Sequence, residues 1–441
     1  MPAPSPIQKR AAELSGLVLE IWAQLSREGG MASTRVAEAF RAAGKLSPGA
    51  KARVLEDLHG MLRQARRVEF ALDSAGVPAR SQLRDRARLL AARLLSGRID
   101  AQAALAELPG VEWARVAQVD EAIAREVDPI RRFGLTHSLP DALARELLEA
   151  YGAEAEALAR SFAAPAPRTL RVNTLKATRE AVAAELAAQG LRVRPTEFSP
   201  CGLVLEGPGD PFATRAFLEG RIEMQDEASQ LVAELAAPAP GSLVVDVCAG
   251  AGGKTLALGA LMRNKGVLAA IDRHAGRLRE LKFRARRAGL FCHRALEADL
   301  HAQPWPKALK AMEGMAARVL VDVPCTGTGA LRRNPEARGR LDAEEMERLP
   351  LEQERLARAA MAFCKPNGRL LYATCSVLPA ENERVVERLL ADSRFQLVPI
   401  AEILGAARGR ALADTSGRYL KLLPHRHGTD GFFAAVLRLR K

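Results

Sequence analysis

The stretch that decides the fold is Leu243–Thr255, which reads LVVDVCAGAGGKT. It opens with apolar strand-forming residues and continues into a turn with glycines at 250, 252 and 253. A strand that passes through a glycine-rich turn into a helix lets a ligand approach the backbone closely and exposes helix N–H groups to it. The stretch therefore predicts the first strand, turn and helix of a nucleotide-binding α/β sheet.

The sequence beyond this turn alternates between strands and helices. Strands are predicted at Leu243–Val247, Val267–Ile271, Val319–Val321 and Arg369–Ala373, with helices between them. Such alternation is typical of a mostly parallel, doubly wound sheet. A last strand over Gly431–Leu437 is expected to pair at the edge of this sheet.

The turn favours a nucleoside over a phosphate. A P-loop requires glycine at the position of Cys248, so Gly253-Lys254-Thr255 does not complete one. Asp272 ends the next strand, where an acid can bond ribose hydroxyls; the alternative is that Asp272 only caps the following helix. Asp299 follows a weaker strand, Phe291–Leu296, and is expected to meet the adenine edge.

Two cysteines follow the ends of two predicted strands. Cys325 lies in Asp322–Gly329 and Cys375 follows Thr374. A buried cysteine is usually a small hydrophobic residue, but two beside a nucleoside pocket favour catalytic thiols. A thiolate that adds to carbon 6 of cytosine activates carbon 5 toward a methyl donor, and Asp322 is placed to contact ring nitrogen 3. The positions of Cys325 and Cys375 in the sequence do not by themselves show which of the two is the nucleophile.

The region before the sheet divides in two. Residues 1–135 read as an all-helical domain of five to seven helices, since apolar residues recur at intervals of three and four. Residues 136–240 predict a linker helix over Asp141–Phe162 and a small α+β subdomain of order βαββ. Residues 241–441 form the sheet domain.

Composition limits the classes of partner. The 441 residues carry a formal net charge of +13, which suits a polyanion, although arginine-rich coding also makes proteins basic. No apolar run is long enough for a membrane helix, and Met1–Pro6 is rich in proline and unlike a signal peptide. We expect a cytoplasmic monomer. The six cysteines form no CxxC pair, so no metal is expected.

Several stretches resemble the Nol/Nop/Sun family of RNA cytosine-carbon-5 methyltransferases. They are Arg171–Asn173, Gln225–Ser229, Asp246–Thr255, Asp322–Gly329, Thr374–Ser376 and Asp430–Phe433. Lys45–Arg63 also resembles the NusB-like RNA-binding domain that precedes the catalytic part in the family's bacterial 16S rRNA methyltransferases of the Sun/Fmu (RsmB-like) type.

The resemblance implies a Rossmann-like methyltransferase domain that uses S-adenosylmethionine, preceded by a NusB-like helical domain and an RRM-like subdomain. It implies that Cys375 is the nucleophile, that Cys325 assists product release, and that the substrate is RNA, such as 16S rRNA or a small-subunit precursor. The implied cofactor contacts are Cys248, Ala249, Gly250, Ala251, Gly252, Gly253, Lys254, Asp272, Asp299 and Asp322.

The sequence departs from the family at Gly250-Ala251, where the family has Ala-Pro, and this loosens the turn. Three alternatives remain. The same chemistry on tRNA cannot be distinguished by sequence. A catalytically idle assembly factor would not need to retain Asp322 and both thiols. An amino-methylating enzyme typically carries Asn/Asp-Pro-Pro-Tyr in place of Asp322–Cys325.

Overall fold

The computed structural model describes residues 6–79 and 83–440. The proline-rich stretch considered as a signal peptide lies, except for Pro6, outside the described residues. The chain forms two compact units, one of residues 1–164 with 331–343 and one of residues 165–330 with 344–441. Among the described residues, no helix is long and apolar enough to cross a membrane.

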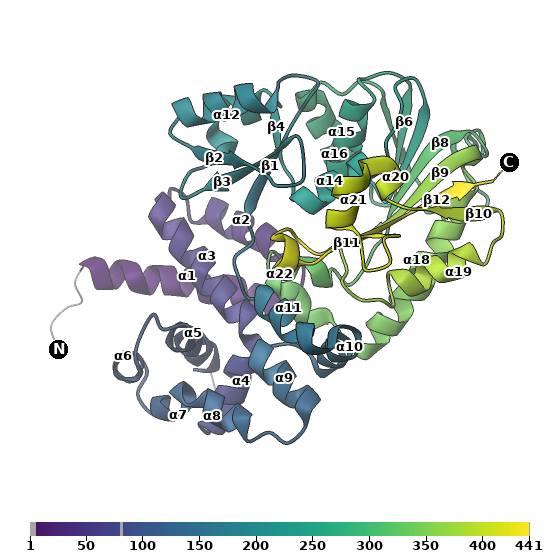
Figure 1. Cartoon of the computed structure of the whole chain (residues 1–441). Helices are drawn as coiled ribbons and strands as arrows, with labels where there is room; N and C mark the ends of the chain where they lie inside the picture. Colours follow the sequence, from purple (N-terminus) through teal and green to yellow (C-terminus); the bar gives the residue numbers. More distant parts are fainter. Residues whose placement is uncertain (1–5, 80–82, 441) are drawn as a thin grey trace. The chain divides into compact units, whose positions relative to one another are not determined.

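The first unit is helical, as predicted (Figure 1). Its helices are α1 (Pro6–Glu28), α2 (Ala32–Ala42), α3 (Pro48–Arg63), α4 (Ala65–Ser74), α5 (Arg84–Leu95), α6 (Ala101–Glu107), α7 (Trp113–Ala117), α8 (Val119–Ala124), α9 (Pro129–His137), α10 (Asp141–Tyr151), η1 (Gly152–Glu154), α11 (Ala155–Ser161) and η4 (Pro335–Arg340). Ser47 caps α3 and Pro48 occupies its first turn, because a proline there loses no helical hydrogen bond.

Two details of this unit differ from the prediction. The described part of residues 1–135 holds α1 to α8 and most of α9, more than the five to seven helices expected, because α6 to α8 are too short to show a period. The single helix predicted over Asp141–Phe162 is wrong: α10 ends at Tyr151, and Gly152 adopts φ 51° and ψ −122°, a conformation that glycine tolerates.

The second unit begins with a small antiparallel sheet. Its elements are β1 (Arg168–Val172), α12 (Arg179–Ala188), β2 (Arg192–Pro195), β3 (Gly202–Glu206), η2 (Pro211–Ala213), α13 (Arg215–Leu218) and β4 (Ile222–Met224), and the strand order is β2-β3-β1-β4. The predicted βαββ order is present, and β4 is an additional strand too short to recognise in the sequence. Alternate residues such as Leu170 and Leu203 form a core with Val182 and Leu186 of α12.

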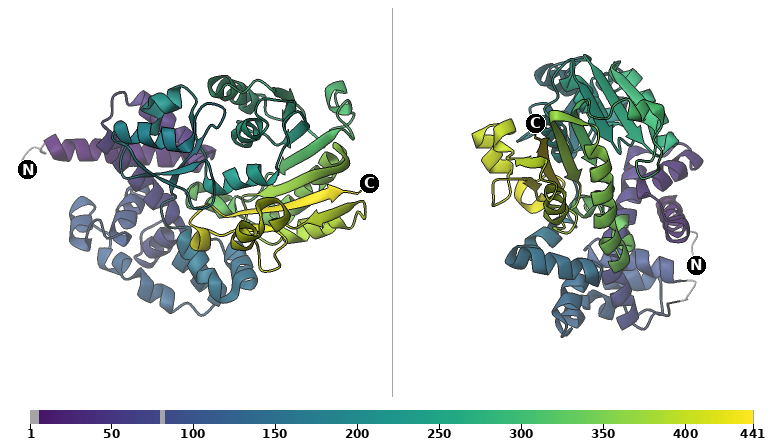
Figure 2. Two further views of the ribbon diagram at one scale, coloured as in Figure 1. Left: turned by 45° about the horizontal axis from the view of Figure 1, so that its top comes forward. Right: turned by 90° about the vertical axis from the view of Figure 1, so that its right-hand side faces the viewer.

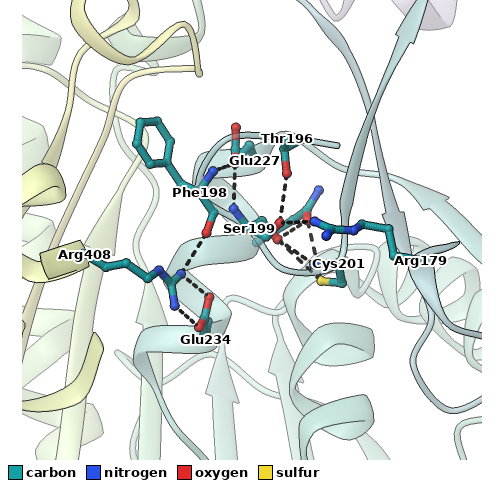
Figure 3. A network of polar contacts seen from close by, with 9 residues as sticks. Arg179, Thr196, Phe198, Ser199, Cys201, Glu227, Glu234 and Arg408 are labelled. Atoms are coloured by element: carbon teal, nitrogen blue, oxygen red, sulfur yellow. Dashed lines mark hydrogen bonds and ion pairs between the residues drawn. The ribbon is translucent and has the colours of Figure 1, made fainter. Parts of the chain in front are cut away.

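The loop between β2 and β3 is fixed to helix α14 (Glu227–Leu235), as Figure 3 shows. Glu227 Oε1 accepts hydrogen bonds from the backbone N–H groups of Phe198 (2.5 Å) and Ser199 (2.7 Å). Arg408 of α21 (Ala406–Leu412) donates to Phe198 O at 2.9 Å and pairs with Glu234 at 2.6 Å. These polar contacts hold the small sheet against the larger one.

The large sheet contains β5 (Leu243–Val247), β6 (Val267–Asp272), β7 (His293–Glu297), β8 (Ala316–Asp322), β9 (Cys364–Thr374), β10 (Phe395–Val398), β11 (Leu420–Leu422) and β12 (Phe432–Leu439). The order is β10-β12-β9-β8-β5-β6-β7, with β11 also paired to β12. Strands β5 to β9 pair in parallel, as predicted. The last strand is not at the edge as expected: β12 lies between β9 and β10, antiparallel to both, because the unpredicted β10 covers it.

Helices cover both faces of this sheet (Figures 1 and 2). Side chains on one face of the sheet, such as those of Val244 and Leu320, pack against α14, α15 (Gly253–Leu261) and α16 (Ala275–Ala288). Side chains on the opposite face, such as those of Val245 and Val319, pack against α17 (Lys307–Lys310), α18 (Ala343–Met361) and α19 (Glu383–Leu390). The short elements η3 (Thr328–Ala330), α20 (Ala401–Leu404) and α22 (Pro424–His427) lie in the connections. This doubly wound arrangement brings the carboxyl ends of β5, β6, β8 and β9 to one edge.

Candidate active site

The glycine-rich turn, residues 248–253 and here called the cofactor loop, leaves β5 in an unusual conformation. Cys248, Gly250 and Gly252 have φ of 60°, 55° and 85°, in the left-handed region. A Cβ on Gly252 would lie 2.6 Å from Leu281 Cγ of α16, so this position also requires glycine for close packing. The turn therefore presents its backbone and the first turn of α15 to the edge of the sheet.

Asp272, at the end of β6, supports the cofactor loop. Its Oδ2 accepts a hydrogen bond from Gly250 N and its Oδ1 accepts one from His274 N, both at 2.8 Å. It therefore holds both the turn that precedes α16 and the cofactor loop, whereas the residue at the N-cap position of α16 is His274. Each oxygen keeps a second lone pair for a ligand.

A cavity of about 200 Å³ opens beside this carboxylate. Its apolar lining includes Val247, Ile271, Leu300 and Leu356. Its polar and charged lining comprises Asp272, Arg273, His274, Arg277, Asp299, His301, Glu352 and Gln353. Acidic oxygens beside an apolar slot suit the ribose hydroxyls and the flat base of an adenosine moiety. Asp299, expected from the sequence to meet the adenine edge, thus lines the same cavity as Asp272.

Lys254 and Asp322 form an ion pair beside the cofactor loop. Lys254 Nζ lies 2.6 Å from Asp322 Oδ2 and 4.9 Å from the centre of the Phe432 ring. Burial opposes the charge on Lys254, but the pair with Asp322 outweighs it and raises the pKa of Lys254. The pair joins α15 to the end of β8, so two expected site residues lie in direct contact.

Asp246 lies behind this pair with no exposed surface. Its Oδ2 accepts a hydrogen bond from Thr255 Oγ1 at 2.6 Å, and within the described chain its Oδ1 has no partner. Burial raises the pKa of Asp246 to about 7.

Cys325 and Cys375 come together at the ends of β8 and β9. Their Sγ atoms lie 3.3 Å apart, and Gly329 N donates to Cys375 O at 2.9 Å. The hydrogen bond with Cys375, burial, and the nearby carboxylate of Glu381 raise the pKa of the Cys325 thiol well above its usual range. The sequence placed each cysteine at a strand end; the structure brings both sulfurs to one point.

Two sets of contacts at this edge were not found in the sequence. Glu381, Gln353 and Thr326 form a buried hydrogen-bonded group beside Cys325. Arg284 of α16 donates to Ala251 O of the cofactor loop at 2.9 Å and to Glu223 of β4 at 3.1 Å. The run Glu381–Glu383 resembles ordinary acidic residues at a helix start, and Arg284 resembles one more exposed arginine, so neither gave a usable signal.

Comparison with known proteins shows which family the chain belongs to. Residues 233–438 match the family model described as 16S rRNA methyltransferase RsmB/F, and residues 139–211 match the ferredoxin-like domain of RsmF/B-like methyltransferases. A protein of Synechocystis named probable ribosomal RNA small subunit methyltransferase B is 37% identical over 69% of this chain and 68% of its own length. The chain belongs to the RsmB/F family of 16S rRNA methyltransferases.

Other members and solved structures agree with this membership. The Bacillus subtilis protein named probable ribosomal RNA small subunit methyltransferase B is 32% identical over 70% of this chain and 68% of its own length. The human 28S rRNA (cytosine(4447)-C(5))-methyltransferase is 32% identical over 62% of this chain and 34% of its own. A methyltransferase homolog from Pyrococcus horikoshii superposes with a TM-score of 0.60 at 28% identity, over 71% of this chain and all of its own.

As a member of the RsmB/F family, this protein is an S-adenosylmethionine-dependent RNA cytosine-C5 methyltransferase. The cavity fits the cofactor, since it offers Asp272 and Asp299 oxygens and apolar walls to an adenosine moiety. The resemblance to the RNA cytosine-C5 methyltransferases is confirmed by these matches, whereas the NusB-like resemblance of the helical region stays a prediction.

Proposed function

We propose that this RsmB/F-family enzyme methylates a flipped cytosine of 16S rRNA through a covalent bond between that cytosine and Cys375. The observation that carries the proposal is the 3.3 Å separation of the Cys325 and Cys375 sulfurs, at the sheet edge shared with the cofactor loop. One thiol alone would suffice as a nucleophile. Two in contact suit a reaction that must both form and break a carbon–sulfur bond.

In the proposed reaction the Cys375 thiolate adds to carbon 6 of cytosine, and the electron pair of the 5,6 double bond moves toward carbon 5. When bound, S-adenosylmethionine supplies the electrophilic methyl group. Asp322 contacts ring nitrogen 3, and its pair with Lys254 holds the Asp322 carboxyl group in place. A water molecule then takes the proton from carbon 5, and the electron pair of that carbon–hydrogen bond restores the 5,6 double bond. The bond between carbon 6 and the Cys375 sulfur breaks, so that the sulfur leaves as a thiolate, a step that Cys325 assists.

The cofactor contacts in this proposal come from Cys248–Lys254, Asp272, Asp299 and Asp322. Asp272 and Asp299 line the cavity, and Asp272 also fixes Gly250. The helical residues 1–135 are proposed to bind RNA as a NusB-like domain, followed by an RRM-like part (136–240) and the catalytic part (241–441). The enzyme is proposed to act as a cytoplasmic monomer without a metal; light scattering of the purified chain tests the oligomeric state.

The small-subunit target is supported by relatives whose names specify that RNA. Bisulfite sequencing of 16S rRNA and of tRNA, each incubated with purified protein and S-adenosylmethionine, tests it. One protected cytosine in 16S rRNA is expected. Protection in tRNA alone would overturn the assignment of the RNA while leaving the chemistry intact.

The covalent step is tested with cysteine variants. Cys375→Ala is expected to lose methyl transfer by at least about 10³-fold, since the nucleophile is gone. Cys325→Ala is expected to accumulate an RNA–protein adduct that survives denaturing electrophoresis. Cys292→Ala is the matched control, because this thiol lies just before β7 and not beside the pair. An adduct that still forms in Cys375→Ala would contradict the proposed nucleophile.

A further inference from the structure

A buried carboxylate lies directly behind Cys325. Glu381 follows β9 and has no exposed surface. Its Oε1 accepts hydrogen bonds from Thr326 N (2.9 Å) and Gln353 Nε2 (2.7 Å), and its Oε2 accepts one from Thr326 Oγ1 (2.5 Å). The Glu381 carboxylate therefore accepts hydrogen bonds from three donors, two of them on Thr326.

The same group holds the backbone on both sides of Cys325. Gln353 of α18 donates to Pro324 O at 2.9 Å as well as to Glu381. Glu381 fixes Thr326 through both its backbone and its hydroxyl. The residues before and after Cys325 are therefore tied to one carboxylate–amide pair, which leaves the Cys325 side chain little freedom.

A parallel set of contacts fixes the loop that carries Cys375. Thr328 Oγ1 lies 3.0 Å from Ser376 Oγ and accepts a hydrogen bond from Val377 N at 3.0 Å. Asn382, the neighbour of Glu381, donates to Ser376 O at 3.0 Å. The turn at residues 381 and 382 thus connects both cysteine loops and sets the distance between their sulfurs.

The charge of Glu381 acts on Cys325 because its three donors are neutral. After the hydrogen bond with Cys375 and burial, the nearby negative charges raise the pKa of Cys325 further. Burial and then Glu381 raise the pKa of Tyr372, whose hydroxyl donates to Glu381 O at 2.6 Å. The other ionisable groups at this edge of the sheet include Cys375 and the paired Lys254 and Asp322. Helix α18 contributes the neutral amide of Gln353.

We propose that Glu381 is a positioning residue that clamps the loop carrying Cys325 and presents this thiol in its neutral form to the sulfur of Cys375. The clamp makes the two thiols different: Cys325 keeps its proton and donates it toward Cys375, which is left to act as the nucleophile. The meaning of this asymmetry for catalysis rests on the proposed function. The clamp and the protonation state of Cys325 do not.

The decisive experiment measures the chemistry of Cys325 without RNA. In the full-length Cys375→Ala chain, the rate at which iodoacetamide alkylates Cys325 is followed by peptide mass spectrometry from pH 6 to 10, with and without Glu381→Gln. The glutamine keeps the shape and removes the charge. The alkylation profile is expected to move to lower pH, so that Cys325 reacts about fivefold faster at pH 8.

Glu383→Gln is the matched control. It makes the same change two residues away, on a carboxylate paired with Lys421 at 2.6 Å, and is expected to leave the profile in place. A profile that Glu381→Gln does not move would overturn the electrostatic half of the proposal. If Glu381→Gln and Glu383→Gln move the alkylation profile equally, the effect is a general one of charge, and the electrostatic half of the proposal is overturned as well.

A second pair of variants tests the clamp if Glu381→Gln does not fold, as judged by circular dichroism and cofactor binding. Thr326→Val removes the hydroxyl bonded to Glu381, and Thr326→Ser retains it. The valine variant is expected to lower kcat about tenfold with an unchanged KM for RNA, and the serine variant to restore it. Equal activity of the two would overturn the clamp. Full methyl transfer by Cys375→Ala would instead refute the proposed function and leave the alkylation result valid.

Discussion

The cofactor loop and the two cysteine loops lie at the same edge of the same sheet but are held in different ways. The cofactor loop, residues 248–253, depends on backbone conformation and on two outside supports, Asp272 at Gly250 N and Arg284 at Ala251 O. The cysteine loops, residues 324–329 and 374–378, are held by a buried group of side chains centred on Glu381, Thr328 and Ser376.

The difference follows from what each region must do. A loop that binds and releases a cofactor on every turnover is supported at a few points, so its contacts with the protein stay open to a ligand. Two thiols that are proposed to act on one cytosine ring require fixed geometry, and buried hydrogen bonds provide it. Substitutions in the cysteine loops should therefore lower methyl transfer without changing cofactor affinity, and substitutions at the cofactor loop should change cofactor affinity without changing the thiols.

Among substitutions that leave both cysteines in place, the largest effect on methyl transfer is expected from Gly329→Ala, which disturbs the cysteine loops alone. A Cβ at this position would lie 2.2 Å from Gly431 O, so the backbone that bonds Cys375 O must move. We expect methyl transfer to fall by about 10²-fold and stability by about 2 kcal/mol. Cofactor affinity, measured by calorimetry, is expected to stay unchanged.

Gly339→Ala is the control for this substitution, since a Cβ there meets nothing within 4 Å. It should behave as the wild type. A loss of cofactor affinity in Gly329→Ala would show that the two regions are coupled, and the comparison would fail.

Arg284→Lys is expected to have an intermediate effect, confined to the cofactor loop. The guanidinium reaches Ala251 O and Glu223 together, and a lysine ammonium cannot span both. We expect the Kd for S-adenosylmethionine to rise about tenfold, with the alkylation profile of Cys325 unchanged. Arg279→Lys, on an exposed position of the same helix, is the control. An unchanged Kd would mean that the backbone alone fixes this loop.

Asp246→Asn is expected to change methyl transfer least and to change the pH dependence of stability instead. Because burial raises the pKa of Asp246 to about 7, the folded protein favours the protonated acid. Its contribution to stability is therefore complete below about pH 4 and is lost as the pH rises through 7, by about 1 kcal/mol per pH unit. The asparagine variant should lack this component when melting temperatures at pH 5.5 and 8 are compared. Parallel pH dependence in both proteins would exclude Asp246 as its source.

The sequence predicted some helices and strands of the fold better than others. Strands β5 and β6 were predicted within a residue because buried parallel strands are continuous apolar runs bounded by turns. Strand β4 and helices α6 to α8 were missed or merged, since segments of three to seven residues are too short to show a period. The place of β12 inside the sheet depends on β10, and pairing between distant strands leaves no local pattern.

The sequence by itself determined the family and the cofactor, and it supplied the residues proposed to carry the chemistry, because a glycine-rich turn and cysteines at strand ends are local features. The tertiary structure alone decided what surrounds them. Glu381 reaches Thr326, Arg284 reaches Ala251, and the Cys325 and Cys375 sulfurs come to 3.3 Å. These contacts join residues far apart in the chain, and their geometry depends on how helices and strands pack, which the linear order of residues does not express.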